Sequence, residues 1–408
     1  MNTHATLATQ KNHSVAATLL AGLPLFTLLP LGQDFFLPGV FKIGEYFGNQ
    51  NVGSLAITVY MMCWGIGQVL WGGVVDSFGK KKSAILGLLL FAIGSYFAAI
   101  SSPNEDVNFL LGRALQSLGG AGCFTAIFAI VRTRFEGKQL NRGYSYLYGV
   151  MGFVPVASPV LGGFLLQSND WQFLFEIMTW LGFISIVWVS LSLPKESSKD
   201  KVNTGPAKIS ALEAYGIVLK DTVFLNYLVV AVLVQTLFLY YLSYGPAYFI
   251  GQLNMDELGF GQQFTIVAAV FLIMSFLAPQ IIDRFSTYKL LKLAMLLMTL
   301  GSSLMYIMAD VHDWYAVTAP MILMTVGITL VMTSCPARAL ANLKEQAGVA
   351  SGLYSAAQFG LSAAIAGLLF TLFDSTDLHV VALASLACLV IPWALLLFSS
   401  TVKTGHSS

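Results

Sequence analysis

The chain has 408 residues, of which 56% are hydrophobic and 10% are charged, and its mean hydropathy is +0.74. A soluble domain carries about 25% charged residues, so this composition excludes a soluble globular enzyme and also a disordered protein. The net charge of +1 argues against a nucleic-acid-binding protein, which would show a basic patch or stripe. The remaining class is a protein that crosses a membrane several times.

Apolar runs long enough to cross a bilayer recur along the whole chain. A hydrocarbon core about 30 Å thick needs about 20 apolar residues. The first run follows a short polar head and lacks a convincing cleavage site, so we expect a membrane span there rather than a cleaved signal peptide. Twelve spans are predicted, at residues 15–37, 53–75, 83–101, 107–132, 144–167, 173–194, 223–250, 264–285, 289–309, 315–341, 349–373 and 380–402.

The basic residues predict the orientation of these spans. Lys and Arg stay on the cytoplasmic side, whereas acidic residues contribute little. Alternate loops, with Lys11 and Lys403 near the termini, hold every basic residue except Lys42 and Arg113, so both termini are predicted to be cytoplasmic. The basic loop residues are Lys80, Lys81, Lys82, Arg132, Arg134, Lys138, Arg142, Lys195, Lys199, Lys201, Lys208, Lys220, Arg284, Lys289, Lys292, Arg338 and Lys344.

The longest polar stretch divides the spans into two sets of six. We expect an N-terminal six-helix bundle at 1–194, a cytoplasmic linker at 195–222 and a C-terminal six-helix bundle at 223–408. Within the linker, residues 209–219 are predicted to form either a helix on the inner membrane surface or a solvated segment. Two six-helix halves are typical of a transporter whose substrate site lies between internal repeats.

The sequence lacks the motifs expected of a membrane enzyme or of an ATP-driven protein. A membrane enzyme would need a cluster of catalytic side chains at one depth, and direct use of ATP would need a phosphate-binding loop. The cysteines lie in apolar runs without C-x-x-C spacing, which predicts neither a disulfide nor a metal site. They are Cys63, Cys123, Cys335 and Cys388.

Two ionisable residues are clearly embedded in the predicted spans. Asp34 is placed about one helical turn from the outer boundary of span one, and Arg113 about two turns below the same boundary in span four. Embedded charges are costly and mark functional sites by default. A low-dielectric surrounding and a nearby guanidinium have opposite effects on the proton affinity of a carboxyl group, so Asp34 could load and release a proton. The alternative is a permanent ion pair. Glu176, near the outer start of span six, is a weaker proton-site candidate, and the interpretation favoured for it is a solvated acid at the membrane interface.

The loop between spans two and three carries a recognisable motif. It contains Gly72, Asp76, Gly79, Lys80 and Lys81 at the spacing G-x-x-x-D-x-x-G-[RK]-[RK]-[RK]. Glycines allow close helix approach, and the lysines lie where a cytoplasmic loop needs them. The run resembles the signature of the major facilitator superfamily, which implies a role for these residues in conformational gating.

Two more motifs resemble those of the drug:proton antiporters in that superfamily. Span four contains Arg113 and Gln116 followed by glycines, similar to R-x-x-Q-G-x-G-A. Span five reads S-P-V-L-G-G from residue 158, similar to G-P-x-x-G-G, and its gating candidates are Pro155, Pro159, Gly162 and Gly163. Prolines and glycines at these positions also suit a bending, closely packed helix.

Span one narrows the resemblance to one group of exporters. Residues 34–38, D-F-F-L-P, resemble an element of the Bcr/CflA-type multidrug exporters. In that family the first-span acid and the fourth-span arginine are associated with proton coupling, which implies this role for Asp34 and Arg113. The second half of the chain matches only in outline, with Asp283 and Arg284 as a remnant of the loop signature.

Polar and aromatic residues near the expected central axis are candidates for contact with substrate. Aromatic rings offer apolar area with a polar handle, and they can hold a cation. The candidates are Gln33, Tyr60, Trp64, Gln68, Gln116, Tyr148, Gln235, Tyr240, Tyr241, Tyr244 and Gln358.

The sequence therefore predicts an all-α integral membrane protein with twelve transmembrane helices in two six-helix bundles around a central cavity. The resemblance implies proton-coupled export of small amphipathic compounds by alternating access, without a cofactor, by a monomer in the bacterial inner membrane. One alternative is a dedicated carrier of a single solute, such as a siderophore or an amino-acid derivative. Another is a membrane sensor that binds a ligand without moving it.

Overall fold

The computed structural model describes residues 15–135, 137–193, 211–282, 284–343, 346–373 and 377–398, and all their regular secondary structure is helical. Apolar segments inside a bilayer must satisfy their backbone polar groups internally, which an α-helix does. The first half contains α1 (Val15–Asp34), the 3-10 helix η1 (Leu37–Gly39), α2 (Val40–Tyr46), α3 (Asn51–Phe78), α4 (Lys80–Ala99), α5 (Asp106–Arg134), α6 (Gly137–Leu166) and α7 (Trp171–Ser192).

The second half has the same number of long helices, two of which include π-helical segments. It contains α8 (Ala211–Val218), α9 (Thr222–Pro246), η3 (Ala247–Gln252), α10 (Glu257–Ile282), α11 (Thr287–Ile307), α12 (Tyr315–Ala339), α13 (Ala347–Ala356), η4 (Ala357–Leu361), α14 (Ser362–Leu372) and α15 (Leu378–Phe398). The π-helices are η3 and η4.

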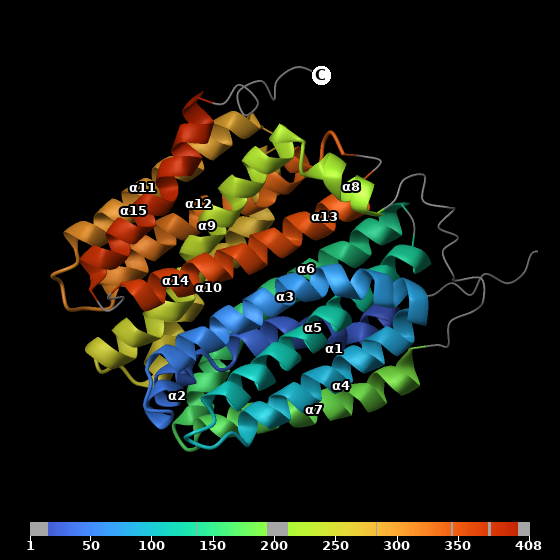
Figure 1. The fold of residues 1–408 in the computed structure, drawn as a ribbon. Helices are drawn as coiled ribbons and strands as arrows, with labels where there is room; N and C mark the ends of the chain where they lie inside the picture. The colour runs from blue at the N-terminus through green and yellow to red at the C-terminus, as the bar shows by residue number, and fades with distance from the viewer. Residues whose placement is uncertain are drawn as a thin grey trace, which may run out of the picture.

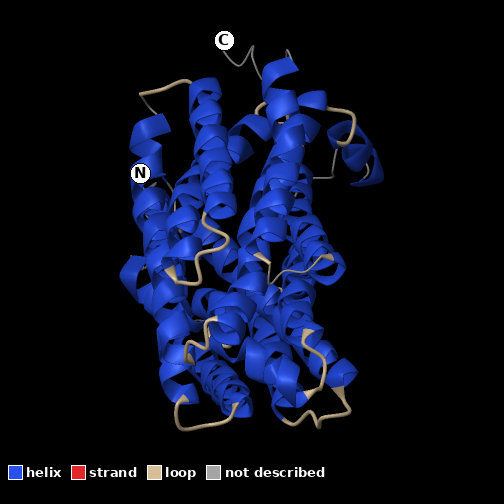
Figure 2. Cartoon of the chain, turned by 90° about the vertical axis from the view of Figure 1, so that its left-hand side faces the viewer, coloured by secondary structure: helices blue, strands red, loops and turns tan. Residues whose placement is uncertain are grey.

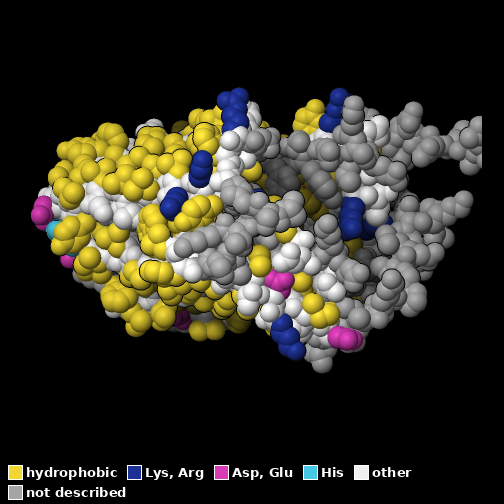
Figure 3. Space-filling model, turned by 90° about the horizontal axis from the view of Figure 1, so that it is seen from above, with side chains coloured by type: hydrophobic (Ala, Val, Ile, Leu, Met, Phe, Trp, Pro, Cys, Tyr) yellow, Lys and Arg dark blue, Asp and Glu magenta, His cyan; other side chains and the backbone are white. Residues whose placement is uncertain are grey.

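Twelve helices in the described part of the chain are long and apolar enough to cross a membrane, which confirms the predicted all-α fold. Figure 2 shows helices joined by loops throughout the described part of the chain. An even number of crossings places the start of α1 and the end of α15 at the same end of the molecule. Figure 3 shows hydrophobic side chains spread over a broad flank of the surface, as lipid contact requires. Exposed examples are Leu191 and Ile307, at 82% and 75% of full exposure.

The first span is longer than the sequence predicted. Instead of ending near Leu37, it continues through η1 and α2 to Tyr46. Pro38 lies in the first turn of η1, where a missing backbone N–H is tolerated, so the proline does not end the span. Asp34 is therefore not one turn from the end of the span, because α2 extends the span beyond it.

Two groups of helices lie side by side in Figure 1. In one group α5 packs on α1, α3 and α4, and in the other α12 packs on α9, α10 and α11. The groups meet along two seams, where α6 contacts α10 and where α3 contacts α13, η4 and α14.

The end of the molecule that carries α2, η3 and the last turn of α14 is called the distal end below. It lies opposite the start of α1 and the end of α15 (Figure 1). At the other end, α8 forms within the stretch predicted as a surface helix or a solvated segment, and it packs on α13. Lys11, Lys195, Lys199, Lys201, Lys208, Asp283, Lys344 and Lys403, on which sequence predictions rested, lie outside the described residues.

Candidate functional site

The guanidinium of Arg113 is completely buried and held at the end of α1. Because α1 ends at Asp34, the carbonyl of Gly32 is one of the last four of the helix and has no partner within it. Arg113 Nη1 donates to this carbonyl at 2.8 Å and also to Oε1 of Gln116. The helix dipole favours a cation at a helix C-terminus. The end of α1 at Asp34 therefore provides a favourable binding position for the guanidinium of Arg113.

Aromatic rings enclose the same guanidinium. Its Cζ lies 4.0 Å from the ring centroid of Phe36, 4.3 Å from that of Tyr60 and 5.6 Å from that of Phe175. Ring faces attract cations most strongly where water is excluded. The rings thus replace part of the hydration that Arg113 gives up on burial.

Asp34 is also buried, at 2% exposure, but the two charged side chains form no ion pair. Its Oδ1 accepts no hydrogen bond from any described residue, and Nε and Nη2 of Arg113 have no acceptor among them. Unpaired buried polar atoms are costly. The carboxyl group and the guanidinium therefore keep unused hydrogen-bonding capacity for a proton, a water molecule or a ligand.

Two predicted ligand residues belong to this cluster. The hydroxyl of Tyr60 donates to the carbonyl of Leu29 at 2.8 Å, and Gln116 Nε2 donates to Ser95 Oγ at 2.8 Å. Both side chains are fully buried. Their bonds within the N-terminal half position Arg113 and its surroundings. Sequence reasoning did not single out Phe36, although it lies in the quoted D-F-F-L-P run.

Three other candidates form an aromatic cluster on α9. Tyr244 packs on Tyr240 and on Tyr241, with ring centroids 5.2 Å and 5.7 Å apart, and Tyr241 stacks on Phe264 at 5.9 Å. All three tyrosines are at most 1% exposed. The hydroxyl of Tyr241 has no partner in the described part of the chain.

Of the remaining candidates, Trp64 and Gln358 lie where α3 meets η4. Trp64 of α3 stacks on Phe359 of η4, with centroids 4.2 Å apart, and Gln358 precedes that ring. The nitrogen Nε1 of Trp64 and Nε2 of Gln68 have no acceptor among the described residues. Gln33, Gln235 and Gln358 are 9%, 7% and 8% exposed. The side chain of Tyr148 lies outside what the structure describes.

The loop-signature residues differ in what they contact. Gly79 joins α3 to α4 with a φ of 89°, a conformation that favours glycine. Lys81 Nζ donates to the carbonyls of Ser190, at 2.7 Å, and Leu193, and so caps the end of α7. Lys80 begins α4, a Cβ on Gly72 would meet open space, and the side chain of Asp76 is not described.

The motif of span five lies at the distal part of α6. Pro155 and Pro159 are inside the helix, and Gly162 and Gly163 follow within its last two turns. A Cβ on Gly162 would overlap the carbonyl oxygen of Phe35, directly after α1 ends. A Cβ on Gly163 would overlap the backbone of Glu257 in the other half. The two glycines therefore bring α6 close to the break in the first span and to the start of α10.

Comparisons with known proteins agree with this architecture. Residues 22–367 match the model of the Major Facilitator Superfamily. The chain is 28% identical to the multidrug resistance protein MdtL of Shewanella oneidensis over 85% of this chain and 86% of that protein. It is 26% identical to the protein of that name from Klebsiella pneumoniae subsp. pneumoniae, over 83% of this chain and 85% of the relative.

Solved structures share the fold at low sequence identity. A mutant of the nucleoside transporter NupG has a TM-score of 0.76 at 12% identity, covering 93% of this chain and 98% of its own. The xylose transporter XylE of E. coli has a TM-score of 0.72 at 13% identity, covering 93% and 97%. With its twelve apolar helices and these relatives, the chain is a multi-pass bacterial membrane protein. It belongs to the major facilitator superfamily, and it is a transporter rather than an enzyme.

Proposed function

We propose that this transporter exports small amphipathic compounds in exchange for protons. The observation that carries the proposal is the buried carboxyl group of Asp34, whose Oδ1 is unpartnered beside a guanidinium with two unpartnered nitrogens. The relatives are named multidrug resistance proteins, which supports the export of such compounds. The proton gradient supplies the energy, and no cofactor takes part.

Asp34 and Arg113 act as the proton-coupling pair in this mechanism. A negative charge at the C-terminal end of α1 is disfavoured by the helix dipole, whereas the charge of Arg113 is favoured there. Moving α6 against the break after Asp34 changes the surroundings of the carboxyl group, because Gly162 contacts the carbonyl of Phe35. A proton taken up from outside neutralises Asp34, and it is released inside when the carboxyl group again faces the arginine.

Ligand contact in this proposal comes from the aromatic and amide residues at the centre. Tyr241, Trp64 and Gln68 offer buried polar atoms without partners, and rings stand beside them. Such a surface suits flat lipophilic compounds that carry one or two hydrogen-bonding groups. The motif residues of α3, α4 and α6 allow the halves to rock around this site.

The chain is proposed to act as a monomer in the inner membrane, with both termini in the cytoplasm. Six spans at 1–194 and six at 223–408 form the two rocking units, joined by the linker at 195–222. The distribution of Lys and Arg between alternate loops supports this orientation. In this proposal the distal end lies on the outer side of the membrane.

Proton flux in liposomes tests the function. The wild type should move protons when unrelated lipophilic compounds are supplied, and Asp34→Asn should abolish this flux while ligand binding persists. Glu176→Gln, which alters an exposed acid on α7, is the matched control and should keep the flux. Flux with one compound of a broad panel would make the protein a dedicated carrier, and unchanged flux in Asp34→Asn would refute the coupling role.

A further inference from the structure

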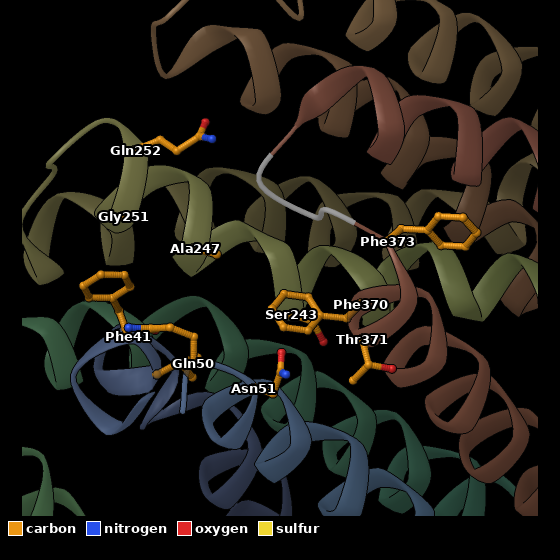
Figure 4. A pocket seen from close by; sticks show the side chains of 11 residues that line it. Phe41, Gln50, Asn51, Ser243, Ala247, Gly251, Gln252, Phe370, Thr371 and Phe373 are labelled. Carbon is orange, nitrogen blue, oxygen red and sulfur yellow. The ribbon is translucent and has the colours of Figure 1, made fainter. Parts of the chain in front are cut away.

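A cavity of about 410 Å³ lies between the two halves at the distal end (Figure 4). Its walls include Phe41, Gln50 and Asn51 from the N-terminal half and Ser243, Gln252 and Phe370 from the C-terminal half. None of the residues predicted to contact substrate lines it. Its volume falls within the range of small-molecule sites, about 300–1,000 Å³.

The lining combines amides with aromatic rings. Gln50, Asn51 and Gln252 are exposed, and their amide groups make no hydrogen bond with the described part of the chain. Figure 4 shows the amide of Asn51 directed across the gap toward Ser243 and Phe370. Each amide can donate and accept hydrogen bonds, while the rings of Phe41 and Phe370 offer apolar contact.

No charged side chain is among the described residues that line the cavity. Among the described residues beside it, Lys42, next to Phe41, pairs with Glu257 at 2.9 Å, so that positive charge is compensated. A charged ligand would lose hydration here without gaining a counter-charge. An uncharged ligand with an amide or hydroxyl group between rings would satisfy the free amides and cover the apolar wall.

Because the cavity lies between the two halves, a ligand bound in it affects how the halves move apart. Outward opening must separate α2 and α3 from α9, η3 and α14, and these five elements supply most of the walls. A ligand that contacts both walls binds the closed distal end better than the open one, so it shifts the equilibrium toward closure. The contact of Phe41 with Gly251 shows how closely the walls already approach, since a Cβ on Gly251 would lie 3.0 Å from that ring.

We propose that the distal cavity binds an uncharged aromatic compound carrying hydrogen-bonding groups, and that the bound compound holds the two halves together and slows transport. The site is separate from the Asp34 and Arg113 cluster. Only the effect on transport rests on the proposed function, because binding can be measured without it.

Protection of a cysteine tests binding. Thr371 is an exposed cavity residue, so Thr371→Cys can be labelled with a membrane-impermeant maleimide, with the unsubstituted chain as the background. The probe is benzanilide, in which an amide joins two phenyl rings. The comparison compounds are 4-carboxybenzanilide, which adds a charge, and trans-stilbene, which lacks the amide. Benzanilide should protect the cysteine at concentrations at least tenfold below those of either comparison compound.

Variants locate the site. Asn51→Leu should raise the benzanilide concentration for half-protection about tenfold, equivalent to about 1.4 kcal/mol. Gln252→Leu, in the C-terminal half, should raise it by a similar factor and replaces the first variant if that one does not fold. Asn104→Leu, an exposed amide at the same end outside the cavity, is the matched control and should change nothing. Equal protection by trans-stilbene, or undiminished protection in both cavity variants, would overturn the proposal.

A second measurement tests whether the bound compound slows transport. In liposomes, benzanilide should lower the maximal proton flux of the wild type and of Asn104→Leu, and this inhibition should weaken about tenfold in the cavity variants, in parallel with protection. Protection of the cysteine without inhibition of proton flux would overturn the proposal that the bound compound slows transport. If the wild type moves no protons with any compound, the proposed function fails, and the protection experiment still decides whether the cavity binds.

Discussion

The fourth spans of the two halves, α5 and α12, bury different kinds of side chain. In the N-terminal half, α5 buries Arg113 and Gln116 beside Asp34 of α1. In the C-terminal half, the corresponding α12 buries hydroxyl groups such as those of Thr325 and Thr329, and its neighbour α9 buries tyrosines. Asp34 and Arg113 are the charged residues that the described part of the chain buries, and both lie in the N-terminal half.

This difference indicates that the two halves contribute different functions. Charged groups with unused hydrogen-bonding atoms can change state, whereas packed rings provide a stable surface for ligands. The C-terminal half also carries both π-helices, η3 and η4, and π-helical turns are common where a helix serves a function. We therefore expect changes in the N-terminal core to affect coupling and changes in the C-terminal core to affect ligand affinity.

Replacing Arg113 should have the largest effect. Arg113→Leu removes two hydrogen bonds from a charged donor and leaves the end of α1 unsatisfied, so we expect a loss of coupled flux of about a hundredfold. Arg113→Lys keeps the charge but not the geometry and should recover only part of the flux. Met324→Leu, an equally buried exchange in α12, should stay within a few-fold of the wild type. Similar losses in Arg113→Leu and Met324→Leu would remove the distinction between the halves.

Helix contact in the N-terminal half should be the next most sensitive feature. The methyl group of Gly162→Ala must displace the carbonyl of Phe35, which costs about 1–3 kcal/mol and lowers both thermal stability and transport rate. Gly72→Ala meets open space and should instead stabilise helix α3 by up to about 1 kcal/mol. Thermal unfolding of both variants measures the contrast. A stable Gly162→Ala with normal flux would show that this close approach is not needed for movement.

The sequence predicted the parts of this fold that depend on hydrophobic length and on local motifs. All twelve spans were located, because a bilayer imposes one length on every helix. The predicted end of span one near Leu37 was wrong, because η1 and α2 continue the span to Tyr46 and Pro38 is compatible with the first turn of η1. Asp34 and Arg113 were found because embedded charges stand out in an apolar run.

The partners of those charges could not be predicted in the same way. Gly32 contributes a backbone carbonyl, which leaves no mark in the sequence, and the ring of Phe36 is one of 29 phenylalanines. Lys42 did not fit the alternation of basic loops, but its partner Glu257 lies more than 200 residues along the chain. Contacts between the halves depend on the packing of α6 on α10, which periodicity within a helix does not reveal.

The ion pair between Lys42 and Glu257 joins the two halves and should have a moderate effect. Lys42 also donates to the carbonyl of Leu166 at 3.2 Å, so Lys42→Met removes contacts between three elements. Half-exposed pairs contribute about 0–1 kcal/mol, so labelling of Ser243→Cys from outside should rise up to about fivefold. The double exchange of Lys42→Glu with Glu257→Lys should restore slow labelling. Fast labelling in the double variant would mean that the pair does not hold the distal end closed.

Removing single tyrosine hydroxyl groups should give the smallest effects. The change in protein stability should differ in sign between the two halves. Tyr60→Phe loses a 2.8 Å hydrogen bond to Leu29 and should lower the stability of the protein by about 1 kcal/mol. Tyr241→Phe removes a buried hydroxyl that has no partner among the described residues, so stability should be unchanged or higher. If that hydroxyl instead serves the ligand, Tyr241→Phe should weaken binding of hydrogen-bonding compounds several-fold and leave proton coupling intact. Thermal unfolding and ligand titration of both variants check these signs, and a matching loss of stability in the two would contradict the proposed difference between a structural tyrosine and a ligand-binding one.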